Sequence, residues 1–157
     1  MSTFEVALVS PLAPAQAFGA VTDWPAHSRT VPLTRVSVVQ DHAGVGDRFV
    51  SRTALGRFGF DDPMEVVEWT PPRRCVVVKQ GRVVRGQAGI EVTPEPGGGS
   101  RVVWRESARI GPRPLSTVLD PFVALLGPLV FRRLLRGLLR EAQPRKAQLR
   151  KDGYGHG

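Results

Sequence analysis

Residues 116–139 read STVLDPFVALLGPLVFRRLLRGLL and form the most apolar stretch of the chain. At the 3.6-residue period of an α-helix, the apolar residues of 118–129 share one face, and those of 131–139 share a face rotated by roughly 90° or more. Gly127-Pro128 lies between the two sets. The pattern predicts a long helix from about Ser116 to Lys151 with a kink at Pro128, because proline removes a backbone donor and clashes with the preceding turn. Pro144 predicts a second disturbance near its end.

The sequence before this helix consists of short β-branched segments separated by Gly- and Pro-rich turns, a pattern typical of an antiparallel meander. We expect six strands there, near Arg35–Gln40, Asp47–Thr53, Phe60–Trp69, Cys75–Gln80, Gly86–Thr93 and Arg101–Ile110.

The N-terminal part predicts a further strand and two short helices. Phe4–Val9 has strand composition, and a helix is expected from Pro14 to the Asp23-Trp24-Pro25 segment, because a residue before proline avoids the α region. A second short helix is expected over Pro25–Arg29. The chain is thus predicted to be α+β, with seven strands.

The chain has 157 residues, which suits one domain, expected over residues 1–152 with a disordered tail at 153–157. Its longest apolar run, Phe122 to Phe131, is shorter than the roughly 20 residues that span a bilayer. Because no secretory signal pattern begins the sequence, we expect a cytoplasmic protein. The single cysteine, Cys75, excludes an intramolecular disulfide and a cysteine-rich zinc site.

The net charge of +8 is concentrated near the C-terminus. Residues 1–131 carry 14 basic and 12 acidic side chains, whereas residues 132–157 carry eight and two. The predicted body of the domain is therefore nearly neutral, which argues against a general surface for nucleic acid.

Four local motifs, together with the order of elements, carry a family resemblance. They are Val21–Pro25 at the end of the first helix, Gly44–Phe49 at a turn, Val66–Arg74 with its double proline, and Gly97–Trp104 at a glycine-rich hairpin. They resemble the START-like (SRPBCC) superfamily, which includes plant Bet v 1-like proteins and bacterial polyketide cyclase/dehydrase-type domains. The resemblance implies the helix-grip fold, in which a curved antiparallel sheet wraps around a long kinked C-terminal helix.

The resemblance also implies that an apolar small molecule, such as a polyketide, lipid or isoprenoid, binds between sheet and helix. The protein would act as a carrier or as a cyclase/dehydrase-like enzyme. The alternative is an interaction module that docks its C-terminal helix on a membrane or a protein, without catalysis. For the cavity we expect a lining that includes Trp24, Phe49, Val66, Ile90, Trp104, Phe122 and Leu126. For any one of the tryptophans, ordinary core packing is the favoured interpretation.

Two residues are candidates for proton transfer, and neither sits in a catalytic signature. Glu106 shares the strand period of Val102 and Trp104, so it would face the cavity, where burial raises the pKa of a carboxyl. It could instead pair with an arginine such as Arg85. His27 follows Trp24 near the expected cavity mouth. Asp61-Asp62 precedes a proline and is interpreted as a turn or a solvated pair. No metal or cofactor is expected.

Arg132, Arg133, Arg136 and Arg140 make the second half of the expected helix basic and amphipathic. Three interpretations stay open: a solvated face near the negative end of the helix dipole, contact with anionic lipid headgroups, or contact with nucleic acid. The last is disfavoured, because no aromatic residues are interleaved to stack on bases.

Overall fold

A computed structural model describes residues 2–144. Seven antiparallel strands form one curved sheet in the order β1-β7-β6-β5-β4-β3-β2. The strands are β1 (Ser2–Ser10), β2 (Thr34–Gln40), β3 (Arg48–Leu55), β4 (Phe58–Thr70), β5 (Arg74–Gln80), β6 (Val84–Pro94) and β7 (Ser100–Ile110). All seven predicted strands are confirmed, with ends shifted by up to a few residues.

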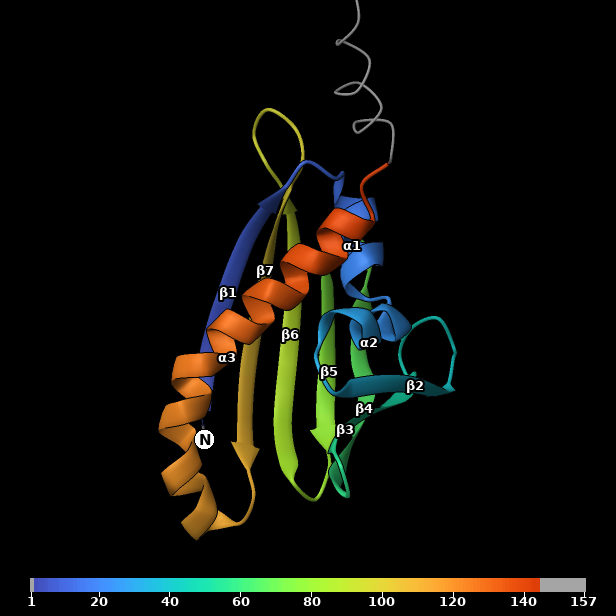
Figure 1. The fold of residues 1–157 in the computed structure, drawn as a ribbon. Coiled ribbons are helices and arrows are strands. Elements are labelled where there is room, and N and C mark those ends of the chain that lie inside the picture. The colour runs from blue at the N-terminus through green and yellow to red at the C-terminus, as the bar shows by residue number, and fades with distance from the viewer. Residues whose placement is uncertain (1, 145–157) are drawn as a thin grey trace, which may run out of the picture.

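The helices lie on one face of this sheet (Figure 1). They are α1 (Pro14–Val21), the 3-10 turn η1 (Trp24–Ala26), α2 (His27–Thr30) and the long α3 (Arg113–Glu141). α3 crosses the sheet in front of β1 and β7, and α1 and α2 lie beside its C-terminal half (Figure 1). The helix-grip fold is confirmed, with short helices after the first strand and a long C-terminal helix.

α3 changes direction between its N-terminal and C-terminal halves (Figure 1). Pro121 and Pro128 lie inside the helix, so each removes a backbone donor from the helical ladder. The helix ends at Glu141, earlier than the predicted Lys151, because a helix usually stops before the residue that precedes a proline, here Pro144. Residues 145–157, which include the end of the expected domain and its tail, lie outside the described part.

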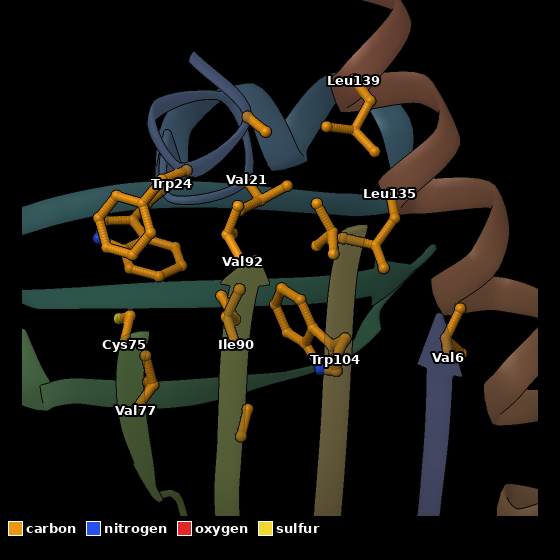
Figure 2. Packing of buried hydrophobic residues seen from close by; sticks show 14 of the residues in the cluster. Val6, Val21, Trp24, Cys75, Val77, Ile90, Val92, Trp104, Leu135 and Leu139 are labelled. Atoms are coloured by element: carbon orange, nitrogen blue, oxygen red, sulfur yellow. The ribbon is translucent and has the colours of Figure 1, made fainter. Parts of the chain in front are cut away.

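The core is formed where α1 and the C-terminal half of α3 cover the sheet (Figure 2). Leu135 and Leu139 from α3, and Phe18 and Val21 from α1, pack against strand residues that alternate inward along β5, β6 and β7. Ile90 on β6 is fully buried among them. This end of the molecule is closed by apolar packing.

The N-terminal half of α3 is different, because most of its apolar side chains are exposed. Phe122 is 59% exposed, and six apolar neighbours are exposed with it: Leu115, Val118, Leu125, Leu126, Leu129 and Val130. By length and composition α3 could cross a membrane, and only 11% of its most apolar 18-residue segment is buried. The expectation that no segment of the chain spans a bilayer rested on the length of the longest uninterrupted apolar run. The whole of α3, with its polar residues included, is long enough and apolar enough on average to span one. One such helix is weak evidence of a span.

α3 approaches β1 closely at Gly127. A Cβ atom at this position would lie 2.5 Å from Cε1 of Phe4, closer than two carbon atoms can approach. The ring of Phe4 also packs against Phe131, with 5.3 Å between ring centroids. The glycine therefore sets how close the bent helix lies to the sheet at the edge of the site described below.

Candidate functional site

A cavity of about 250 Å³ lies between the sheet and α3. Its sheet wall includes residues from all seven strands, and the aromatic side chains of Trp24, Phe49 and Trp104 contribute to the lining. Trp24 stacks on Phe49 with 4.5 Å between ring centroids and 12° between planes. The lining is mostly apolar, as is usual for sites that bind small molecules.

The helix wall of the cavity comes from one face of α3. It consists of Val123, Gly127, Val130, Phe131 and Leu134. Val130 is 45% exposed although it lines the cavity, and Val31 and Thr34 on the facing side are partly exposed. We therefore place the mouth between α3 and the α2–β2 segment.

Three charged side chains lie inside this apolar cavity. Nζ of Lys79 is 2.8 Å from Oε1 of Glu106 and 3.5 Å from Oδ2 of Asp62. The Lys79 side chain is 12% exposed, and those of Asp62 and Glu106 are 8% and 3% exposed. The second oxygen of Glu106, Oε2, accepts a hydrogen bond of 2.9 Å from Nε1 of Trp104. We call Asp62, Lys79 and Glu106 the charged triad.

The triad forms because strand alternation turns three residues from three strands to the same face. Lys79 has the parity of the buried Cys75 and Val77, and Glu106 that of Trp104. β6 separates the strands of Lys79 and Glu106, and it offers only Gly86 and Ala88 at the intervening positions. Because these residues are small, the long side chains of Lys79 and Glu106 can meet above them.

The electrostatics of the triad keep Lys79 charged. Burial alone would lower the pKa of Lys79, but the carboxylates of Glu106 and Asp62 outweigh it and hold that pKa above its ordinary value. Burial raises the pKa of Asp62, which Lys79 only partly offsets. Oδ1 of Asp62 has no hydrogen-bond partner among residues 2–144 and lies beside Gly81, which adds to the cost of a charge there.

His27 lines the same cavity and is 9% exposed. Its Nε2 lies 3.0 Å from the carbonyl oxygen of Val21, so in the neutral ring Nε2–H donates a hydrogen bond to that oxygen and Nδ1 keeps its lone pair. Burial lowers the pKa of His27, and the charge of Lys79 lowers it further, despite opposing contributions from Val21 and Asp23. His27 is therefore a neutral base at pH 7.

The structure brings together five of the nine residues singled out from the sequence. Glu106, His27, Trp24, Phe49 and Trp104 line the cavity. Val66 and Ile90 lie in the closed core that α1 covers and do not line it.

Phe122 and Leu126 point away from the cavity and are 59% and 52% exposed. The inward face of α3 passes through 123, 127 and 130, and a shift of one residue turns a side chain by roughly 100°. The prediction chose the wrong apolar face of this half of the helix, because periodicity alone does not say which of two faces meets the sheet.

Two interpretations of charged residues need correction. Glu106 pairs with Lys79 rather than with Arg85, whose Nε donates to the carbonyl oxygen of Gly81 instead. Asp61 and Asp62 lie within β4, where Asp61 is exposed and pairs with Arg52 while Asp62 is buried in the triad. Lys79 was not singled out from the sequence. The available signal was the alternation of side chains along β5, which puts Lys79 on the same face as the apolar residues Cys75 and Val77.

A family model described as polyketide cyclase / dehydrase and lipid transport matches residues 1–143. The chain belongs to this family. The resemblance inferred from the four sequence motifs is thereby confirmed. No functionally curated protein matches the sequence.

Several solved structures share the fold. The protein TTHA0849 from Thermus thermophilus is 19% identical, with a TM-score of 0.74 over 89% of this chain and 96% of that chain. The di-domain ARO/CYC StfQ from the steffimycin biosynthetic pathway is 18% identical, with a TM-score of 0.74 over 92% of this chain and 51% of that chain. The Zhui aromatase/cyclase from Streptomyces sp. R1128 is 12% identical, with a TM-score of 0.67 over 96% and 97%. Family membership and the helix-grip fold support a role in binding a hydrophobic ligand.

Proposed function

We propose that the protein binds a compact apolar small molecule in the cavity between the sheet and α3. The observation that carries this proposal is an apolar cavity of about 250 Å³ with charged groups buried in its wall. An engineered cavity of about 150 Å³ is enough to hold benzene. The volume therefore suits a molecule of about two fused rings, or the end of a longer polyketide, lipid or isoprenoid that projects through the mouth.

Trp24, Phe49 and Trp104 are the proposed apolar contacts of this ligand. All three side chains line the cavity, and Trp24 and Phe49 are fixed by stacking on each other. Such a rigid wall orders few side chains when the ligand enters, so little binding energy is lost to conformational entropy.

As a cyclase or dehydrase, the protein would fold a reactive chain and supply catalysis through proximity. The proposed proton acceptor is His27, because its Nδ1 has no hydrogen-bond partner among the described residues. Glu106 is a weaker candidate, because Lys79 and Trp104 occupy both of its oxygens. As a carrier, the protein would need only the cavity.

A matched pair of substitutions on α3 tests the binding proposal. Val123 lines the cavity and Ala124 beside it is exposed. We expect Val123→Trp to weaken binding of the neutral dye N-phenyl-1-naphthylamine at least about tenfold, whereas Ala124→Trp leaves it unchanged. Circular dichroism checks that both variants fold. Equal dye binding by both variants, or none by the unsubstituted protein, would refute the proposal.

Contact with an anionic membrane is a second candidate function, and the exposed apolar half of α3 favours it. Phe122, Leu125 and Leu129 could enter the interface, while the exposed Arg132, Arg133, Arg136 and Arg140 meet lipid headgroups. Such contact would suit a protein that collects its ligand from a membrane.

Sedimentation with vesicles tests this second candidate. We expect binding to vesicles that contain phosphatidylserine, weaker binding to phosphatidylcholine vesicles, and loss of binding in the double variant Phe122→Ser/Leu125→Ser. Recovery of all the protein in the supernatant with anionic vesicles would exclude this function.

A further inference from the structure

The buried ammonium of Lys79 has more donors than the protein uses. An ammonium carries three N–H groups. Among residues 2–144, two carboxylate oxygens contact Nζ, one from Glu106 and one from Asp62. At least one N–H therefore remains, on a side chain that lines the cavity and is more exposed than either of its partners.

This donor is well placed for a ligand oxygen. It is held by carboxylates from two other strands, so its position is fixed before a ligand enters. The surroundings are apolar, and a hydrogen bond from a charged donor is stronger there than in water. An apolar ligand with one acceptor oxygen could pack against the apolar lining and accept a hydrogen bond from the ammonium.

The charge balance of the triad determines whether Lys79 favours a charged or a neutral oxygen of the ligand. One ammonium faces two carboxyl groups, so the triad carries no surplus positive charge when Glu106 is ionised. A ligand carboxylate would enter without a compensating charge and would lose its hydration. A neutral carbonyl oxygen accepts the hydrogen bond without this cost. Because the carboxylates keep Lys79 protonated, it donates a proton in a hydrogen bond and does not attack the carbonyl as a free amine.

We propose that Nζ of Lys79 binds the carbonyl oxygen of the ligand, so that the cavity selects an apolar ketone over the matching hydrocarbon and the matching carboxylate. This inference rests on the proposed function and adds the chemical class of the ligand. The same N–H would stabilise negative charge that develops on that oxygen if a proton leaves the adjacent carbon.

Three bicyclic probes that share one skeleton test the proposal: tetralin, 1-tetralone and tetralin-1-carboxylate. We expect tryptophan fluorescence titration at pH 7 to give the tightest binding for the ketone, at least about tenfold tighter than tetralin, as a hydrogen bond to a charged group implies. The carboxylate should bind most weakly. In isotope-edited infrared spectra, the carbonyl stretch of bound tetralone should lie well below its frequency in hydrocarbon solvent.

The triple variant Lys79→Met/Asp62→Leu/Glu106→Met removes the ammonium without leaving a buried charge, and it introduces no amide N–H that could replace the lost donor. In this variant the ratio of tetralone affinity to tetralin affinity should fall to about one, and the infrared shift should disappear. If the unsubstituted protein binds tetralin and tetralone equally, with an unshifted carbonyl stretch, the Lys79 proposal is wrong and the binding function stands. A carboxylate that binds tightest, or a covalent tetralone adduct after borohydride treatment, would also overturn it. If no probe binds, the proposed function fails as well.

Discussion

Nζ of Lys79 lies 2.8 Å from Oε1 of Glu106 inside an apolar cavity, and the Glu106 side chain is only 3% exposed. Each charge makes the burial of the other tolerable, since an isolated buried charge is far more costly than a buried pair. The pair therefore links the stability of the fold to the chemistry of the site.

Glu106→Leu should destabilise the protein by about 3 kcal/mol or more, because it removes the main partner of a buried ammonium and the acceptor of Trp104 Nε1. Urea denaturation measures the change. Glu5→Leu is the matched control, since Glu5 forms an exposed pair with Arg105 that solvent screens. A similar decrease in the free energy of unfolding in both variants would show that the buried pair contributes no more to stability than the exposed pair.

Asp62→Asn should become more stable relative to the unsubstituted protein as pH rises above about 4. The pKa of Asp62 is raised by burial, so the folded state holds its proton more tightly than the unfolded state. Its contribution to stability is present below the unfolded pKa and is lost as pH rises through the folded pKa. Urea denaturation at several pH values measures the difference between the proteins. A difference that shrinks with rising pH would contradict the burial argument.

His27 should titrate below its ordinary pKa of 6.5 in nuclear magnetic resonance spectra, because burial lowers that pKa. Its contribution to stability is then present above pH 6.5 and is lost as pH falls from there through the folded pKa. The stability of the His27→Gln variant should not show this decrease as pH falls. An unshifted or raised pKa for His27 would remove it from consideration as a neutral base at pH 7.

Leu135→Ala should lower the free energy of unfolding by about 2–5 kcal/mol, because Leu135 is fully buried. Leu126→Ala on the same helix should change it by less than about 0.5 kcal/mol, because Leu126 is 52% exposed. Comparable effects in urea denaturation would mean that the two halves of α3 are both part of the core.

Cys75 should resist iodoacetamide at pH 8 in the folded protein and react once the protein is unfolded. Its side chain is buried, and burial raises the pKa of the thiol to about 12, so little thiolate is present. Mass spectrometry of the intact chain follows the reaction. Rapid alkylation of the folded protein would show that the sheet opens at β5.

The strands, the short helices and α3 could be predicted because each leaves a local signal. The alternation of side chains along β7 correctly predicts that Trp104 and Glu106 share one face of the sheet. The bend in α3 agrees with the two prolines inside the helix, Pro121 and Pro128, of which the sequence pattern indicated Pro128. These features depend on neighbours in sequence. The predicted helix end at Lys151 was wrong, because the helix ends at Glu141.

The charged triad could not be predicted in the same way, because its members meet through tertiary structure. Asp62 and Lys79 are on adjacent strands, but Glu106 reaches Lys79 only across the small residues Gly86 and Ala88 of β6. Asp62 was interpreted as a turn residue because Pro63 follows it, although β4 continues through both. The outward face of Phe122 and Leu126 likewise depends on how α3 sits against β1.

Ligand binding in this cavity is best tested by native mass spectrometry of the protein purified from its own host, compared with the mass of the denatured chain. We expect a population of folded protein that carries one additional small molecule, which is released on denaturation and is apolar with a carbonyl group. Protein that is reproducibly empty, and that takes up no N-phenyl-1-naphthylamine in solution, would contradict the claim that this cavity binds a ligand.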